Sequence, residues 1–312
     1  MTPTVRVSRT VRRRHGGHGG SLAGHAMLAP ALLVVAAVTL FPIGYAIDMS
    51  LSHVDLGLTG VHLRFDGFHN YSVVFQSPQF WQSLLFTVAF TAVTVVLEFA
   101  LGLLLALLCK SWVRPRGALM SLFLVPWAFI TVVSAELWGY MLNGSYGLMD
   151  AVMQGLHLAQ GNVVWLGTPT LAAASLMAAD VWKTTPFVAL MLLAGLLMIP
   201  DEIYEASDMD GAGPGATFFR ITLPLLRPSM LLALLFRTLQ AFGVFDLPFV
   251  MTGGGPGSST QSLSMLAYNA MFRDFDFGPG TAVAVLTVVV VFLMSLVIIA
   301  MFRGQLTGTY DA

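Results

Sequence analysis

The chain has 312 residues, of which 56% are hydrophobic and only 10% are charged, and its formal net charge is −1. Soluble domains usually carry about 25% charged residues, so this composition excludes a water-soluble enzyme, a disordered regulator and a disulfide scaffold. It predicts an all-α integral membrane protein. The net charge argues against a nucleic-acid partner, and the single cysteine, Cys109, fits no disulfide and no metal-ligand spacing.

Six apolar stretches are long enough to cross a bilayer, which takes about 20 residues as a helix. The first follows a basic tail, but its apolar run is longer than that of a signal peptide, so we expect a retained anchoring helix. The fifth is the least apolar because it contains two charges and a proline. The predicted spans are Ala26–Ile47, Leu84–Leu108, Ala118–Leu142, Leu171–Met198, Met230–Met251 and Thr281–Phe302.

Lysine and arginine predict the orientation of these spans, because cytoplasmic loops carry an excess of both. Nearly all of them lie before the first span, in the second-to-third and fourth-to-fifth connections, or after the last span, whereas the other connections hold only Arg64 and Arg273. Both termini are therefore predicted to be cytoplasmic. The predicted organisation is a basic disordered tail over 1–25, attracted to anionic lipid, a transmembrane domain over 26–302 and a cytoplasmic tail over 303–312.

The chain carries no recognisable catalytic or nucleotide-binding motif. A phosphate-binding loop places a glycine before its lysine, but Lys110 follows Cys109 and Lys183 follows Trp182. No G-x-S-x-G nucleophile motif occurs either. We therefore expect a non-catalytic chain without a cofactor of its own, so that any ATP and Mg would be bound by other subunits.

An acidic cytoplasmic connection over residues 199–228 predicts a short surface helix. Asp201 is a candidate N-cap, and Glu202 and Glu205 fall in the first turn, where the helix dipole favours carboxylates. Gly211 supplies a stop. Such a helix is either a solvated connector or a docking element for a cytoplasmic partner.

The apolar residues of this connection suggest how the helix is placed. Ile203, Ala206 and Met209 recur at a spacing of three and predict one apolar stripe. A second short segment is expected to end at Pro224 and Pro228. The two segments form a predicted helix–turn–helix at the membrane surface.

The same connection resembles the EAA loop of ATP-binding-cassette importer permeases. The triplet Glu205-Ala206-Ser207 is followed after three residues by Gly211, and after nine more by Ile221-Thr222-Leu223-Pro224, with Ser207 in place of the second alanine. In that family the loop forms a coupling helix that docks on the ATPase subunit. The resemblance implies that Glu205, Ala206, Ser207, Asp210 and Gly211 lie at that contact.

Further motifs resemble the maltose and glycerol-phosphate permease type. They are Trp182-Lys183-Thr-Thr-Pro186-Phe187 before the loop, Phe245-Asp246 followed by Thr252-Gly-Gly-Gly-Pro256, and Gly67-Phe-His-Asn70-Tyr71 in the first outward connection. The resemblance implies a six-helix type I importer permease fold in a bacterial cell membrane. It also implies a second homologous permease subunit, two ATPase subunits and an extracytoplasmic solute-binding lipoprotein as partners.

The glycine-rich segment Gly253, Gly254, Gly255 and Pro256 lies on the predicted outer side and lacks a lysine, so it is not a phosphate site. Glycines allow positive φ and close backbone approach. The resemblance implies a loop that reaches toward the external binding protein. The alternative is a flexible turn between the fifth and sixth spans.

Several polar and aromatic side chains inside the spans are candidates for the solute pathway, since intramembrane charges are generally functional or paired. Hydrogen-bonding groups and aromatic faces suit a sugar, and the candidates are Lys183, Gln240, Phe242, Phe245 and Asp246. Helix packing is the alternative role for each of them.

The remaining intramembrane charges have simpler interpretations. Lys183 shares a helix face with Asp180 and could pair with it. Arg237 could face the cavity, while Glu98 and Glu136 are expected to be structural hydrogen-bond partners.

These patterns together predict the permease subunit of an ATP-driven importer that takes up a di- or oligosaccharide by alternating access. Two alternatives remain at this stage: an importer of the same type for another solute, such as a glycerol-phosphate ester, and an ion-coupled secondary transporter.

Overall fold

The computed structural model describes residues 19–57, 60–111, 116–158 and 161–306. It divides into two units, residues 1–47 and 48–312. The first contains most of helix α1 (Gly19–Ser50), which begins within the predicted tail and has an apolar stretch from Leu28 onward that is long enough to cross a membrane. Most of the two predicted terminal tails lies outside the described residues, although α13 (Phe277–Leu306) extends past the predicted end of the last span.

The second unit starts with a β-hairpin that the sequence did not predict. Strands β1 (Ser52–Gly57) and β2 (Gly60–Phe65) pair antiparallel, and helix α2 (His69–Gln76) follows. The Asn70 side chain donates hydrogen bonds to the carbonyl oxygens of Ser50 and Ser52, at 3.0 and 2.9 Å. This amide anchors the base of the hairpin to α2.

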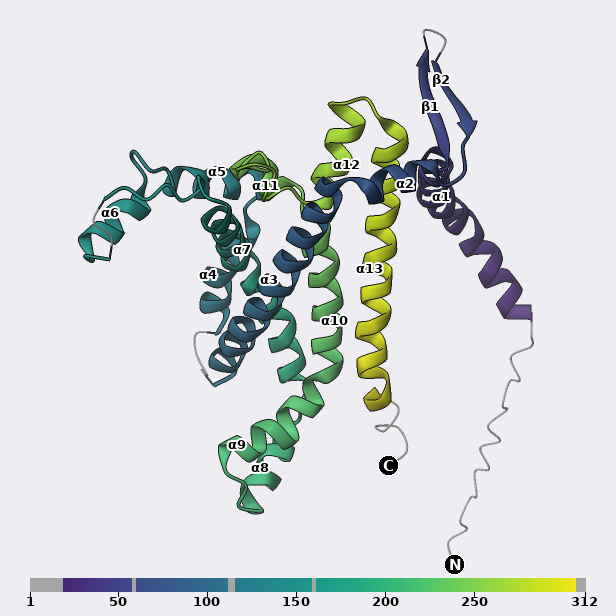
Figure 1. The fold of residues 1–312 in the computed structure, drawn as a ribbon. Helices are drawn as coiled ribbons and strands as arrows, with labels where there is room; N and C mark the ends of the chain where they lie inside the picture. Colours follow the sequence, from purple (N-terminus) through teal and green to yellow (C-terminus); the bar gives the residue numbers. More distant parts are fainter. Residues whose placement is uncertain (1–18, 58–59, 112–115, 159–160, 307–312) are drawn as a thin grey trace, which may run out of the picture. The chain divides into compact units, whose positions relative to one another are not determined.

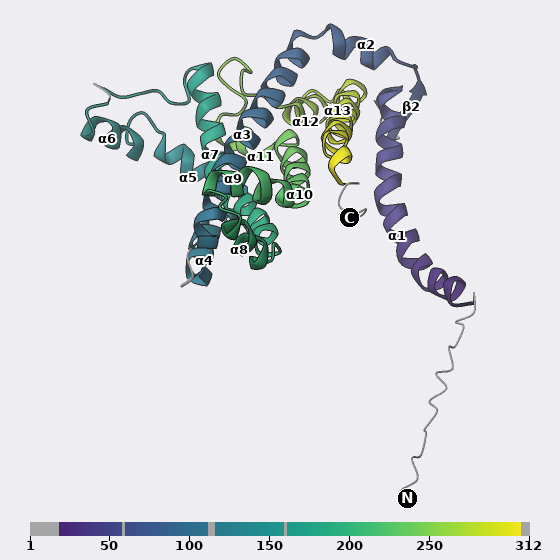
Figure 2. The same ribbon diagram turned by 90° about the horizontal axis from the view of Figure 1, so that it is seen from below.

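Long helices form the body of this unit (Figures 1 and 2). Helices α3 and α7 pack together along much of their length, α10 packs on both and on α13, and α12 packs on α13. The helices are α3 (Pro78–Ser111), α4 (Arg116–Ala128), α5 (Thr131–Met141), α6 (Leu148–Gly155), α7 (Pro169–Leu197), α8 (Asp201–Met209), α9 (Pro214–Thr217), α10 (Leu223–Phe242), α11 (Asp246–Met251), α12 (Leu263–Phe272) and α13.

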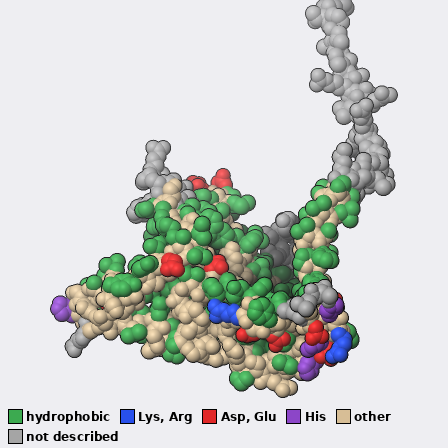
Figure 3. All heavy atoms as spheres, turned by 90° about the horizontal axis from the view of Figure 1, so that it is seen from above, with side chains coloured by type: hydrophobic (Ala, Val, Ile, Leu, Met, Phe, Trp, Pro, Cys, Tyr) green, Lys and Arg blue, Asp and Glu red, His purple; other side chains and the backbone are tan. Residues whose placement is uncertain are grey.

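The outer surface of this bundle is that of a membrane protein. Large hydrophobic side chains are exposed along its long helices. On the end of the molecule seen in Figure 3, charged side chains form only small groups. The described residues contain five helices long and apolar enough to cross a membrane, or six when the bent pair formed by α4 and α5 is counted as one. This agrees with the six predicted spans.

Glycine brings the two central helices together. A Cβ added at Gly102 of α3 would lie 2.9 Å from Cγ1 of Val188 on α7, so only glycine allows this approach. Gly195 plays the same part between α7 and α10, where an added Cβ would lie 2.6 Å from that of Ser229. Small residues at crossing points are typical of membrane helices, because packing rather than hydrophobicity holds those helices together.

Two predicted spans are interrupted. The third bends by 91° between Ala128 and Thr131, where Ile130 has an extended ψ of 137° and Pro126 weakens the preceding turn. The fifth ends at Phe242, and α11 begins only at Asp246. The predicted spans did not include these breaks, because local backbone breaks leave average hydropathy unchanged.

The prediction that Pro224 and Pro228 end a separate segment was also wrong. Pro224 lies in the first turn of α10, which follows α9 through a π-helical turn at Phe218–Thr222, and Pro228 lies inside α10. A proline in the first turn of a helix sacrifices no intrahelical hydrogen bond, and a wider π turn beside it re-routes the backbone. The chain therefore runs from the loop directly into the membrane helix.

A buried charge network ties α3, α7 and α10 together. Arg237 is 2% exposed, and its Nη2 donates to Glu98 at 2.7 Å and to Asp180 at 2.8 Å, while its Nε also binds Glu98. The Thr184 hydroxyl donates a further bond to Glu98. Glu98 is therefore a structural interhelical partner, whereas Glu136 is exposed on α5. Arg237, rather than Lys183, is the ion-pair partner of Asp180 in the described residues.

We expect Arg237→Met to destabilise the protein strongly. The variant would leave the Glu98 and Asp180 carboxylates buried without a counter-charge, a loss of about 3–5 kcal/mol. The midpoint of thermal unfolding in detergent should fall well below that of the unchanged protein.

Arg220→Met is the matched control, because Arg220 is exposed and its loss should leave the midpoint nearly unchanged. Adding Glu98→Gln and Asp180→Asn to Arg237→Met should recover part of the loss, since those changes remove the unpaired charges. An unfolding midpoint for Arg237→Met equal to that of Arg220→Met would contradict this account of the network.

Candidate functional site

A polar cavity of about 320 Å³ opens among α4, α5, α7, α10 and α11. Its walls come from both interrupted spans: Trp127 and Thr131 flank the bend between α4 and α5, and Gly243–Phe245 connects α10 to α11. Non-helical backbone within a membrane is tolerated only where it is buried in protein or lines such a cavity. The two breaks are thus what leaves room for a ligand between the helices.

Four of the five predicted pathway residues line this cavity: Lys183, Gln240, Phe245 and Asp246. Phe242 does not, because it is fully buried and packs in a separate core with residues of α2, α3, α12 and α13. It follows Gln240 by two residues, a rotation of about 200° around the helix, so the two side chains point in nearly opposite directions.

Trp127 and Thr131 are cavity residues that the sequence analysis missed. They are far from the other lining residues in sequence, and only the bend after Ala128 brings them to the cavity. The Trp127 ring also stacks on Phe187, with ring centroids 5.4 Å apart and planes 10° apart. Pro126 beside an aromatic residue was the one available signal of a break at this place.

The charges around the cavity divide into a neutralised set and an available set. Arg237 and Asp180 are bound to each other, and Arg237 Nη1 also approaches Gln240 Oε1 at 3.4 Å. Among the ion pairs of the described residues, none includes Lys183 or Asp246. The cavity therefore offers one cation, one anion, an amide, hydroxyls and aromatic faces. This set can bind a polar solute rich in hydroxyl groups.

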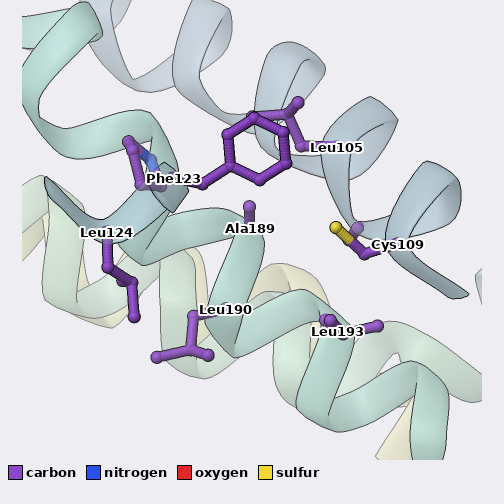
Figure 4. Close-up of a pocket in the computed structure, with 9 residues that line it drawn as sticks. Leu105, Cys109, Phe123, Leu124, Ala189, Leu190 and Leu193 are labelled. Atoms are coloured by element: carbon purple, nitrogen blue, oxygen red, sulfur yellow. The ribbon is translucent and has the colours of Figure 1, made fainter. Parts of the chain in front are cut away.

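A second, smaller pocket of about 20 Å³ lies between α3, α4 and α7 (Figure 4). Its labelled side chains are apolar, with the Cys109 sulfur among leucines and Phe123. Cys109 is buried and packs as a small hydrophobic side chain. The pocket is a gap in the packing and lacks groups that could orient a polar ligand.

The predicted cytoplasmic helix exists as α8, at the opposite end of the bundle from the hairpin and α12 (Figure 1). Pro200, and not Asp201, is its N-cap residue, since Asp201 is already helical. Gly211 has a φ of +74° immediately after the C-cap residue Asp210, a conformation that glycine adopts without strain. The prediction that Gly211 ends this helix is confirmed.

The apolar stripe of α8 differs from the predicted one. Ile203, Tyr204 and Ser207 face the protein, whereas Ala206 is exposed and Met209 is 88% exposed. Steps of three residues rotate by about 300° each, so a stripe begun at Ile203 has left the inner face by Met209.

The outward face of α8 carries most of the predicted contact residues. Glu205 and Ala206 are exposed along it, and Asp210 and Gly211 are exposed at its end. Ser207 instead faces inward and shares a hydrogen bond of 2.9 Å with the hydroxyl of Thr217. A partner could therefore reach all the predicted contact residues except Ser207.

The glycine-rich segment is a closed loop on the hairpin side of the bundle. Gly253 and Gly254 have φ values of +58° and +85°, and the Gly254 N–H donates to the carbonyl oxygen of Pro248 at 3.3 Å. The hydroxyls of Thr252 and Thr260 lie 2.8 Å apart across the loop, and Gly255 and Pro256 lie between them in sequence. These hydrogen bonds indicate an ordered loop rather than a flexible turn.

A longer-range contact fixes the end of this loop. Gln261 is 3% exposed, and its Oε1 accepts a 2.7 Å hydrogen bond from Nε2 of Gln79 at the start of α3. The backbone N–H of Leu263 donates to the hydroxyl of Thr87, also on α3. The loop is therefore held on the bundle.

Comparison with known proteins assigns this architecture. Residues 73–304 match the family described as binding-protein-dependent transport system inner membrane component. The chain is 42% identical over 280 residues to the trehalose/maltose transport system permease protein MalF of Thermococcus litoralis, covering 90% of this chain and 93% of that protein. It is 36% identical over 284 residues to the sulfoquinovosyl glycerol transport system permease protein SmoG of Agrobacterium fabrum, covering 91% of this chain and 90% of that protein.

A solved structure shares the fold. It is the bacterial alginate ABC transporter in complex with an alginate pentasaccharide-bound periplasmic protein, with a TM-score of 0.78 and 22% identity over 91% of this chain and 95% of that chain. The agreement covers the helical architecture of a type I importer permease. The family match over residues 73–304 and the 42% identity to a transport system permease show that this chain belongs to the binding-protein-dependent transport system inner membrane components, the non-catalytic, multi-pass permease subunits of ABC transporters.

Proposed function

We propose that this chain is one permease subunit of an importer that carries a di- or oligosaccharide across the membrane by alternating access. The observation that carries the proposal is the polar cavity at the two helix breaks, where Gln240 and Asp246 offer hydrogen bonds beside the aromatic rings of Trp127 and Phe245. Its volume of about 320 Å³ falls within the range of about 300–1,000 Å³ typical of small-molecule sites. The trehalose and maltose in the name of one relative are disaccharides, and the sulfoquinovosyl glycerol in the name of another is a sugar glycoside.

The charge distribution disfavours the alternative of a phosphate ester. Arg237 is neutralised by Glu98 and Asp180, which leaves Lys183 as the available cation, with Asp246 in the same cavity to repel an anion. The ion-coupled alternative is disfavoured for a related reason: the buried carboxylates of Glu98 and Asp180 are already occupied by Arg237.

The two ends of the bundle suggest where partners bind. In the proposal, α8 faces the cytoplasm and two ATPase subunits bind ATP and Mg, with one of them docking on its exposed face. A second homologous permease completes the pathway, and a solute-binding lipoprotein docks at the opposite end, near Gly253–Pro256. Both termini are then cytoplasmic, and the complex lies in a bacterial cell membrane.

The first test concerns the cavity. We expect Gln240→Leu and Asp246→Leu to lower maltose uptake by about tenfold each in proteoliposomes containing the whole transporter, because losing a hydrogen bond to solute costs about 1–3 kcal/mol. Uptake of labelled maltose in the presence of ATP measures the effect. Gln82→Leu is the matched control, since Gln82 is exposed on α3 away from the cavity. Equal uptake by all three variants would refute the cavity as the solute site.

The second test concerns the energy source. Uptake by the same proteoliposomes should persist when ATP is supplied and all ion gradients are collapsed with ionophores, because the proposed drive is ATP hydrolysis by the partner subunits. Uptake that requires a gradient and ignores ATP would instead identify a secondary transporter.

The third test concerns α8. We expect Gly211→Val to reduce both co-purification of the ATPase subunits and maltose uptake, because φ of +74° costs a residue with a side chain about 1–2 kcal/mol and strains the end of the helix. Gly213→Val is the control in the same turn, since Gly213 has a φ of −71° and open space at its Cβ position. If the two variants behave alike, the exposed end of α8 is not the docking element.

A further inference from the structure

Helix α8 makes a specific contact with the end of α3. The ammonium nitrogen of Lys110, in the last turn of α3, lies 3.8 Å from the centroid of the Tyr204 ring on α8. The hydroxyl of the same tyrosine accepts a hydrogen bond of 3.4 Å from Thr222, directly before α10. Tyr204 thus joins α8 to two membrane helices at once.

The surroundings strengthen this contact. Tyr204 and Ile203 pack on a buried core that includes Ala106 and Cys109 from α3 and Leu226 from α10. A cation over an aromatic face is attracted more strongly where water is excluded. Lys110 also lies at the carboxyl end of a helix, where the helix dipole favours a positive charge. Moving α8 away from α3 would therefore require this favourable contact to break.

Helix α3 leads from this contact to the solute cavity. Glu98 lies twelve residues before Lys110 on the same helix, about 18 Å away at about 1.5 Å per residue. Glu98 binds Arg237, whose other contacts are Asp180 and Gln240 in the cavity wall. A displacement of the Lys110 end of α3 would reach the cavity through these bonds.

We propose that the Lys110–Tyr204 contact is the joint through which a movement of α8 is passed to α3 and, through Glu98, to the cavity wall. Lys110 and Tyr204 are positioning residues in this proposal, since neither touches ATP or solute. The inference rests on the proposed function, because it needs an α8 that is moved by an ATPase.

The experiment uses the whole transporter, reconstituted with its ATPases, its second permease and its binding protein. Lys110→Met keeps the length of the side chain and removes its charge, and Tyr204→Leu removes the ring. Each should lower maltose uptake and the stimulation of ATP hydrolysis by maltose-loaded binding protein by about tenfold, the order of a desolvated cation–π contact. Basal ATP hydrolysis and co-purification of the ATPases should stay unchanged.

Two conservative variants separate coupling from a merely structural role. Lys110→Arg keeps a cation over the ring and should retain coupling, and Tyr204→Phe should do the same because it keeps the ring. The double variant Lys110→Met/Tyr204→Leu should be no worse than Tyr204→Leu alone, since either change removes the contact between the ammonium group and the ring.

The outcomes are distinguishable. If Lys110→Met couples normally, if Lys110→Arg fails as badly as Lys110→Met, or if Lys110→Met prevents assembly with the ATPases, the joint is overturned. If the unchanged transporter shows no ATP-dependent uptake of maltose or of any other di- or oligosaccharide, the proposed function itself fails, independently of this contact.

Discussion

Arg237 brings a positive charge into the interior of a helix bundle, and the packing of the three central helices depends on how that charge is neutralised. Glu98 from α3 and Asp180 from α7 supply the carboxylates, so each of the three helices contributes one member of the network. Burying an isolated charge is prohibitive. The network therefore requires the three helices to stay in register at this level, directly beside the cavity.

The cavity itself follows from two interruptions of the helices. An uninterrupted helix presents only side chains to its neighbours. The breaks after Ala128 and Phe242 interrupt the helices beside the cavity, and Thr131 and Phe245, which follow these breaks, line it. The Arg237 network stabilises one side of this space. The charge network on one side of the cavity and the irregular backbone around it together form a site that can hold a polar solute inside an apolar bundle.

The two functional regions lie at different levels of the bundle and share helices. Helix α3 runs from the Lys110 contact with α8 to Glu98, which binds Arg237 in the cavity wall, and α10 runs from the π-helical turn after α9 through Arg237 to the break at Gly243. Helix α8 packs on a core built from the ends of α3, α7 and α10. In the proposed function, these shared helices would pass a movement of α8 to the cavity.

Composition and hydropathy determined the membrane class and the approximate spans, because these depend on local transfer free energies. Capping residues, carboxylates and a glycine determined the short acidic helix and its end, because these depend on local backbone preference. The candidates Lys183, Gln240 and Asp246, with the aromatic Phe245 beside them, were also identifiable, because polar groups in apolar spans are generally functional or paired. The tertiary structure alone decided that Arg237, and not Lys183, pairs with Asp180, that Phe242 packs in a core, and that Trp127 reaches the cavity. Each of these depends on which helices meet and where their backbones break, and these long-range contacts leave no periodic signal in the sequence.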